Sequence, residues 1–276
     1  MIYDCFTFFN ELDLLEIRLN YLNEVVDKFV LVEMNKTHSN KDKPFYFEEN
    51  KARYKEFLDK IIHIKVEDYP DNNGENHFSS WHLENYQRDC IMRGLIDAKD
   101  DDIVMVSDLD EIPSLEAVKN YTTGIAVLEQ KMMYYYLNNI NVMDPIWRKG
   151  TKIAHLHEMK NPDKEVYLGF GAQYTKRGTP TCLRFYNGPA IKNGGWHFSY
   201  LGGAEAISYK IKSFAHQELN QEGFTSEDKI IQRVNAGQDI FDRGYIYKVV
   251  PLDNSFPEYI LKNQEKYKHL IACIEN

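Results

Sequence analysis

The stretch Asp101-Asp102-Ile103-Val104-Met105-Val106-Ser107-Asp108-Leu109-Asp110-Glu111-Ile112-Pro113 carries the clearest structural signal in the chain. Its four consecutive apolar residues, three of them β-branched, predict a strand that is buried on both faces of a parallel sheet. Pro113 prevents the strand from continuing. Asp108 and Asp110 therefore follow the carboxyl end of this strand, where open α/β sheets bind their ligands.

Two carboxylates that share a crevice repel each other unless a cation neutralises them. Oxygen ligands favour hard ions such as Mn²⁺ or Mg²⁺, which are often shared with the phosphates of a substrate. The alternative is a solvated turn, because Asp-x-Asp pairs are common in proteins. The position of Asp108 and Asp110 after a buried strand favours a metal–diphosphate site.

The length and charge of the chain limit the possible folds and ligands. A chain of 276 residues with 43% hydrophobic residues predicts one large α/β domain, here residues 1–250, with a helical extension over 251–276 packed on it. The formal net charge is −9 and there is no long basic run, which argues against broad binding to nucleic acid. An anionic ligand would need a local cluster of Lys and Arg.

The cysteines Cys5, Cys90, Cys182 and Cys273 are scattered, without a Cys-x-x-Cys pair. They predict buried free thiols in a reducing compartment rather than a disulfide framework. The N-terminus lacks signal-peptide features, and no run reaches the ~20 apolar residues that span a bilayer. We therefore expect a cytoplasmic protein, with peripheral membrane contact and oligomeric state left open.

The first half of the chain alternates strands and helices. Strands are predicted at 2–9, 29–33, 60–66 and 103–107, with helices after Asn10, over 50–60 and over the segment from Leu83 to Leu95. This order predicts a mostly parallel sheet. After Pro113 the pattern becomes partly mixed, with strands predicted at 125–128, 131–137, 152–157, 181–187 and 195–200, a loop or lid over 158–180, and helices over 114–121, 204–219, 225–236 and from 255.

Several separate motifs occur in one order along the chain. They are 6–16 (FTFFNELDLLE), 35–38 (NKTH), 87–88 (QR), 107–113 (SDLDEIP) and 195–199 (GWHFS). Together they resemble glycosyltransferase family 17. The resemblance implies a GT-A fold with an Asp-x-Asp metal site. It also implies Mn²⁺ or Mg²⁺ as cofactor, and transfer of N-acetylglucosamine from UDP-GlcNAc to a glycan hydroxyl.

The resemblance leaves the substrates partly open. Animal members are membrane-anchored Golgi enzymes, whereas this sequence starts at the first predicted strand. A bacterial or viral polysaccharide, a lipid-linked oligosaccharide or a protein therefore competes with an N-glycan as acceptor, and another UDP-sugar could replace UDP-GlcNAc. An α-linked donor and a β-linked product would make the reaction inverting, which requires a base for the acceptor hydroxyl.

Roles for individual residues follow from this comparison. Asp110 is the predicted catalytic metal ligand, Asp108 contacts the ribose or the metal, and His197 is the predicted third ligand, with His216 as its competitor. Either histidine could instead be purely structural. The residues predicted to contact the nucleotide sugar are Asn10, Glu11, Glu33, Lys36, Arg88, Asp108 and Lys210.

Glu205 is the predicted catalytic base, because 202–205 resembles the Gly-Gly-acid segment that supplies the base in some inverting GT-A enzymes. The alternative is an ordinary first-turn acid, since a helix N-terminus favours the ionised form and lowers basicity. Glu111 and Glu158 are the other candidates for the base. Trp81, Trp147 and Trp196 could stack on sugars, although tryptophans more often lie in a core.

Two other functions compete with the transferase. A metal-dependent phosphoesterase would use Asp108 and Asp110 with His155 and His157, which a strand would place on one face. A non-catalytic carbohydrate-binding protein would use the aromatic run 134–136. A Rossmann dinucleotide site, a P-loop, a serine hydrolase and a zinc protease are disfavoured, because their motifs do not occur in the sequence.

Overall fold

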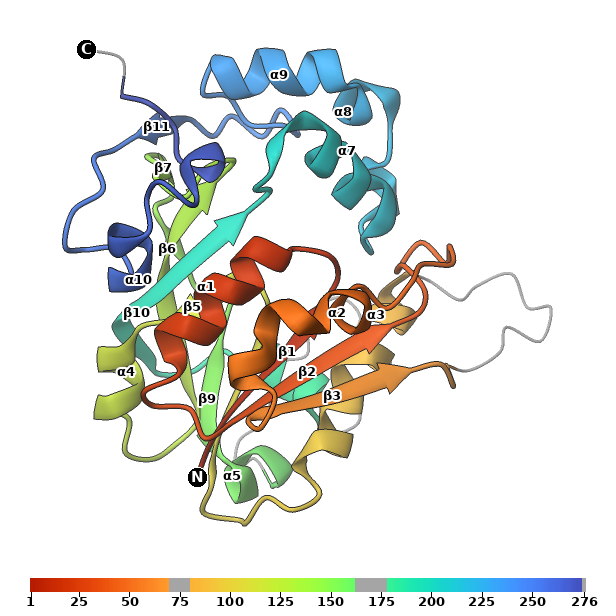
Figure 1. Cartoon of the computed structure of the whole chain (residues 1–276), viewed down its shortest axis with the longest axis vertical. Helices are drawn as coiled ribbons and strands as arrows, with labels where there is room; N and C mark the ends of the chain where they lie inside the picture. Colours follow the sequence, from red (N-terminus) through yellow and green to blue (C-terminus); the bar gives the residue numbers. More distant parts are fainter. Residues whose placement is uncertain (70–79, 162–177, 275–276) are drawn as a thin grey trace.

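The computed structural model describes residues 1–69, 80–161 and 178–274. Its centre is one mixed sheet, in which the strands follow the order β11-β7-β6-β9-β4-β1-β2-β3, with β5, β8 and β10 paired off this path (Figure 1). The strands are β1 (Ile2–Phe8), β2 (Lys28–Met34), β3 (Ile61–Val66), β4 (Ile103–Asp108), β5 (Glu111–Pro113), β6 (Ala126–Tyr134), β7 (Asn139–Asn141), β8 (Ile146–Trp147), β9 (Lys152–His155), β10 (Ala190–Ser199) and β11 (Tyr247–Val249).

The half of the sheet formed by β3, β2, β1 and β4 is parallel throughout. Both of its faces are covered, which explains the apolar run in β4. Met105 belongs to one core cluster, whereas Val104 and Val106 belong to the cluster on the opposite face. Alternate residues of a strand point to opposite faces, so a strand buried on both faces reads as continuously apolar. The prediction of an α/β protein with a mostly parallel, partly mixed sheet is confirmed.

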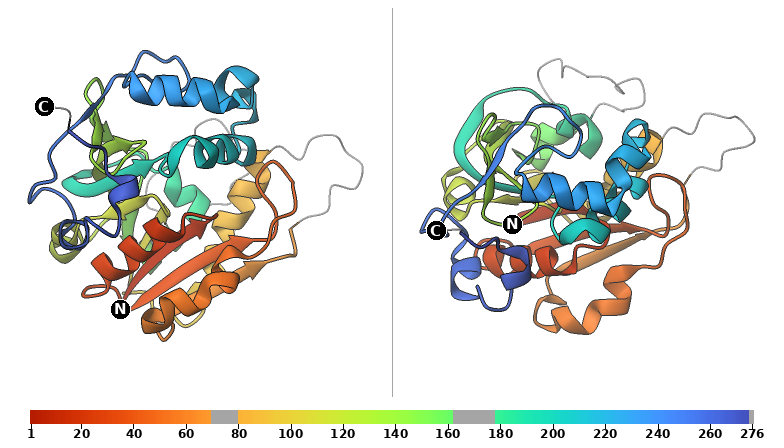
Figure 2. Two further views of the ribbon diagram at one scale, coloured as in Figure 1. Left: turned by 45° about the horizontal axis from the view of Figure 1, so that its top comes forward. Right: turned by 90° about the horizontal axis from the view of Figure 1, so that it is seen from above.

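Helices cover the sheet and close its end. They are α1 (Leu12–Leu22), α2 (Tyr46–Asn50), η1 (Lys51–Phe57), α3 (Ser80–Asp89), η2 (Cys90–Leu95), α4 (Leu115–Asn120), α5 (Leu156–Lys160), α6 (Pro180–Arg184), α7 (Gly203–Ser213), η4 (Gln217–Leu219), α8 (Glu222–Thr225), α9 (Glu227–Asn235), α10 (Glu258–Lys262) and η5 (Lys268–Leu270). α7, α8 and α9 gather where β10 ends (Figure 2). No helix among the described residues is long and apolar enough to cross a membrane.

The second half of the chain differs from the sequence prediction in several places. The strand predicted at 181–187 is wrong, because residues 180–184 form α6, which begins with Thr179 as cap and Pro180 at its first position. The strands predicted at 125–128 and 131–137 are one strand, β6, since Glu129 and Gln130 continue the ladder. The strand predicted at 152–157 ends at His155, and α5 follows. The loop predicted over 158–180 lies largely outside the described residues.

The first residues of two helices also differ in detail from the prediction. The helix predicted after Asn10 begins at Leu12 with Glu11 as its cap, and the Glu11 side chain accepts from Lys210 instead of capping the helix. The helix predicted over 225–236 begins at Glu227 with Ser226 as its cap, and the Ser226 side chain makes no capping bond in the described structure. All four cysteines are free thiols, and all but Cys273 are buried.

The C-terminal segment packs on α1. Phe256, Ile260, Tyr267 and Leu270 are buried in the same core cluster as the inner side of α1. α10 contacts α1 directly. The division into a domain over 1–250 and an extension over 251–276 remains a prediction. Because the two parts share a core, its test is whether residues 1–250 fold without the extension.

Candidate active site

The acidic turn, residues 108–111 at the end of β4, lies among cationic side chains from three other elements. Arg88 comes from α3, Arg184 from α6 and Lys210 from α7. These residues are far apart in the sequence, and the fold brings them to the carboxyl end of the parallel strands. The predicted crevice residues Asp108, Asp110, Arg88, Lys210 and His197 therefore do come together.

Asp108 is held between two arginines. Its Oδ1 accepts from Nη2 of Arg88 at 3.1 Å and from the Thr7 hydroxyl at 3.3 Å, while its Oδ2 accepts from Nη2 of Arg184 at 2.8 Å. Burial alone would raise the pKa of Asp108, but Arg184 and then Arg88 hold it well below its usual value. The side chain remains 32% exposed, so a ligand can reach it.

Asp110 faces a different set of partners. Its Oδ2 accepts from Nζ of Lys210 at 2.9 Å, and Nε2 of His197 lies 3.4 Å from its Oδ1. Burial would raise the pKa of Asp110, but Lys210 and His197 lower it strongly. Lys210 also donates to Glu11 at 2.9 Å, and the two acids keep the Lys210 pKa well above its usual value despite burial. Both aspartates are therefore ionised at neutral pH.

Glu111 is fully buried and occupied on both oxygens. Arg184 donates to Oε1 at 2.8 Å and to Oε2 at 2.6 Å, and the Trp147 indole donates to Oε1 at 2.8 Å. The Trp147 ring lies 4.7 Å from the His197 ring between centroids. Glu111 thus holds Arg184 and Trp147 in place, and it is not available as a base.

Comparisons with known proteins identify the family of the chain. The model of glycosyltransferase family 17 matches residues 1–160, which is more than half of the chain. The chain belongs to glycosyltransferase family 17. Similar curated proteins are the β-1,4-mannosyl-glycoprotein 4-β-N-acetylglucosaminyltransferases of Rattus norvegicus (24% identical) and Homo sapiens (23% identical), each aligned over 95% of this chain and 53% of the relative. The chain thus spans about half the length of these relatives.

The remaining candidates for the base in this family 17 chain differ in their surroundings. Glu205 lies in the first turn of α7 with an exposed side chain. Glu158 lies in α5, where its two oxygens accept from Tyr121, Thr123 and the backbone amides of Gly124 and His155. The structure therefore leaves Glu205 as the accessible acid of the three.

The other predicted nucleotide contacts have different surroundings. Glu33 is fully buried, where it accepts from Nζ of Lys43 at 3.2 Å and lies 3.3 Å from Nε2 of His63, so it anchors the loop after β2. Lys36 pairs with Asp42 at 2.7 Å in that loop. The backbone amide of Asn10 donates to Glu11, beside Lys210.

The candidate histidines lie at different places in the fold. His216 bonds to Glu218 at 2.6 Å and its ring packs against Trp81, so His197 is the histidine at Asp110. His157 lies in α5 rather than on a strand, and His155 pairs with Ile103 at the start of β4. Since Asp108 ends β4, the histidine pair required by a phosphoesterase lies at the opposite end of that strand.

The donors around Asp110 fit a divalent cation in part. Asp110 Oδ1 and His197 Nε2 face each other, and Mg²⁺ or Mn²⁺ sites commonly combine one or two carboxylates with the phosphates of the substrate. Both carboxylate oxygens of Asp108 instead accept hydrogen bonds from arginines. Among the described residues no three His, Cys, Asp or Glu side chains form a ready metal cluster. Asp110 and His197 are thus the residues that would hold the metal.

Sequence patterns gave no role to Arg184, and Trp147 entered only as a possible stacking residue. Arg184 could not be found by pattern, because residues 181–187 were predicted as a strand and the arginine is 76 positions from Asp108. Trp196 donates to the carbonyl of Ser255 at 3.1 Å and lies in the core. Tyr134 and Tyr135 are also buried, which removes them from a sugar-binding surface.

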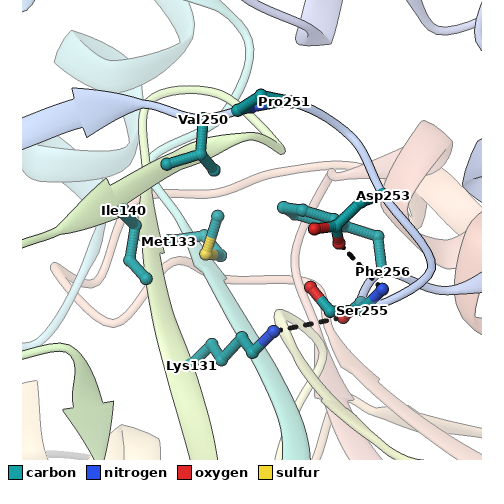
Figure 3. A pocket seen from close by; sticks show the side chains of 8 residues that line it. All are labelled: Lys131, Met133, Ile140, Val250, Pro251, Asp253, Ser255 and Phe256. Atoms are coloured by element: carbon teal, nitrogen blue, oxygen red, sulfur yellow. Dashed lines mark hydrogen bonds between the residues drawn. The ribbon is translucent and has the colours of Figure 1, made fainter.

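A separate pocket of about 360 Å³ lies beside β6 (Figure 3). It is lined by Lys131 and Met133 of β6 and by residues of the C-terminal segment, among them Phe256, and Lys131 donates to the carbonyl of Ser255 at 3.3 Å. β10 pairs with β6 so that His197 lies opposite Met132. Because neighbouring strand residues point to opposite faces, this pocket is on the other side of the sheet from His197.

Proposed function

We propose that the chain is a metal-dependent, inverting N-acetylglucosaminyltransferase with a GT-A fold that moves N-acetylglucosamine from UDP-GlcNAc to a glycan hydroxyl. The observation that carries this proposal is the grouping of Asp110, His197 and Lys210 at the carboxyl end of the sheet in a family 17 chain. The names of the relatives support N-acetylglucosamine as the sugar and a glycan as the acceptor.

The side chains around the turn can each contribute to a single displacement reaction at the sugar. Lys210, Arg88 and Arg184 place three cations where the diphosphate of a nucleotide sugar would lie, and they stabilise the charge that develops on the departing UDP. Asp110 and His197 would hold the cation, which supplies Lewis acidity when bound. Glu205 would accept the proton of the acceptor hydroxyl as the new bond to the sugar forms.

Thermal unfolding with a panel of nucleotide sugars tests this proposal. UDP-GlcNAc at about 100 times its Kd should stabilise the chain by about 2.7 kcal/mol, or roughly 5–10 °C, and only when Mn²⁺ is present. Asp110→Asn should abolish this shift. Asp242→Asn is the matched control, since Asp242 is exposed, pairs only with Arg233 in the described structure, and has a positive φ that asparagine tolerates.

Product analysis then separates the alternatives. Release of UDP together with a glycosylated acceptor is expected. A shift that survives in Asp110→Asn would contradict the metal assignment. Stabilisation by a different UDP-sugar would change the donor alone. Hydrolysis of simple phosphodiesters without sugar transfer would favour the phosphoesterase instead.

A further inference from the structure

Arg18 lies beneath the acidic turn. It belongs to α1, and its side chain is fully buried. Nη1 donates to the carbonyl oxygens of Asp108 at 3.0 Å, Leu109 at 2.9 Å and Glu111 at 2.9 Å. The carbonyl groups of three residues of the turn therefore point at one guanidinium.

The remaining donors of Arg18 complete the arrangement. Nε and Nη2 bind the two oxygens of Asp4 on β1 at 2.8 and 2.6 Å, and Nη2 also donates to the Ser107 hydroxyl at 2.6 Å. The guanidinium carbon lies 4.5 Å above the centre of the Phe6 ring. Asp4 neutralises the charge of Arg18. The turn is therefore held by the planar set of N–H donors of the guanidinium rather than by a net charge.

We propose that Arg18 is a positioning residue that fixes the acidic turn from the inside. With the carbonyl groups of 108, 109 and 111 held inward, the side chains of Asp108 and Asp110 project to the outer side, where Arg184 and Lys210 meet them. A lysine could keep the ion pair with Asp4, but its single ammonium cannot serve both Asp4 oxygens and three carbonyl groups at once.

The expected effect on turnover rests on the proposed transferase function, whereas the effect on the turn does not. A displacement of the acids by about 1 Å would cost about 100-fold in turnover, since the reacting groups must stay aligned. The same displacement would loosen the backbone of 107–111, which hydrogen exchange measures without any substrate.

Arg18→Lys is the test, and Leu19→Ala is its matched control. Leu19 is the next residue of α1, is fully buried in the core and has no hydrogen-bonding side chain, so its truncation removes packing without removing a hydrogen bond to the turn. We expect Arg18→Lys to speed amide exchange in 107–111 and to lower kcat about 100-fold with a small change in KM. Leu19→Ala should lower the Tm while leaving exchange in this segment and kcat near those of the unmodified chain.

If Arg18→Lys does not fold, Ser107→Ala tests the positioning role of Arg18. It removes one acceptor of Nη2 and keeps the ion pair with Asp4, so faster exchange in the turn and a loss of about tenfold in turnover are expected. Normal exchange and turnover in a folded Arg18→Lys, or in Ser107→Ala if the first fails to fold, would overturn the role of Arg18. An unmodified chain without transferase activity would overturn the proposed function instead, and the exchange comparison would still decide Arg18.

Discussion

Glu205 differs from the other acids considered as the base because its carboxylate is exposed. Glu111 and Glu158 use both of their oxygens on protein donors, whereas Glu205 stands in the first turn of α7. A base must reach the acceptor hydroxyl directly or through one water. Glu205 is exposed and its oxygens are not taken up by a hydrogen bond in the described structure, so it stays the predicted base.

Glu205→Gln should therefore lower turnover by about 10²- to 10⁴-fold while leaving the affinity for UDP-GlcNAc unchanged. The amide keeps the size of the side chain and removes its ability to take a proton. Steady-state kinetics and direct binding of the donor measure the two effects. Glu222→Gln, an exposed first-turn acid of α8, is the control and should behave like the unmodified chain. Unchanged turnover in Glu205→Gln would remove Glu205 as the base.

Lys152 on β9 predicts a pH dependence of stability. It is 1% exposed, donates to the carbonyl of Gly150 at 2.8 Å, and burial, aided by Arg184, lowers its pKa to about 7. In the unfolded chain the pKa is about 10.4. Between these values the unfolded state binds more protons, so the free energy of unfolding rises with pH in this window. Below about pH 7 both states are protonated, and the full cost of the buried charge remains.

Lys152→Met removes that cost. Relative to the unmodified chain, the variant should gain most stability near pH 6, and the gain should shrink as the pH approaches about 10. Urea unfolding over a pH series measures this difference. Lys248→Met, at an exposed position of β11, is the control and should show no such trend. A difference between Lys152→Met and the unmodified chain that stayed constant with pH would contradict a depressed pKa.

At the scale of elements, the pairing of β10 with β5 sets the position of His197. His197 lies opposite Glu111 and Trp196 opposite Ile112 in this antiparallel pair. Gly195 makes the close approach possible. Its φ is +132°, and a Cβ there would lie 2.0 Å from the carbonyl oxygen of Ile112.

Gly195→Ala should separate β10 from β5, because that contact is with backbone and cannot move aside cheaply. His197 would move away from Asp110, so we expect a lower Tm and a weaker stabilisation by UDP-GlcNAc with Mn²⁺. Gly223→Ala in α8 is the control, since a Cβ there meets no atom within 4 Å of the described structure and alanine favours a helix. A normal response to the donor and metal in Gly195→Ala would show that the strand pair does not set the site.

The elements also show where sequence patterns suffice. β1 to β4 were predictable because their apolar runs reflect burial on both faces, as with Val104 and Met105. Residues 181–187 were mistaken for a strand, because the short apolar run hid the cap at Thr179 and Pro180. The position of Asp108 and Asp110 at the end of β4 was predictable from the sequence. The pairing of Arg184 with Asp108 was not, since it exists only in three dimensions.

At the scale of the molecule, the site depends on contacts between segments that are distant in the sequence. Lys210 reaches Glu11 across 199 positions and Asp110 across 100, and Arg18 reaches Glu111 across 93. Such contacts carry no local pattern, so spacing along the chain could propose the acids but could not supply their partners. Any change that loosens the whole fold should therefore reach the site.

The C-terminal segment offers the sharpest test of this dependence. Phe256, Ile260, Tyr267 and Leu270 are buried with α1, the helix that carries Arg18. Burying four such side chains contributes about 6–12 kcal/mol, which is comparable with the whole stability of a typical domain. A chain that ends at residue 250 should therefore lose its cooperative thermal transition and its response to UDP-GlcNAc with Mn²⁺.

Circular dichroism and the nucleotide-sugar panel measure both losses. A chain that ends at Ala272 is the control, because it keeps the four core residues and the bonds of Ala272 to Asn138. It should unfold near the Tm of the full chain. If the chain ending at residue 250 unfolded cooperatively and still bound the donor, residues 251–276 would be a dispensable addition to the domain. Loss of both properties would instead show that the segment forms one core with α1 and that the site requires this core.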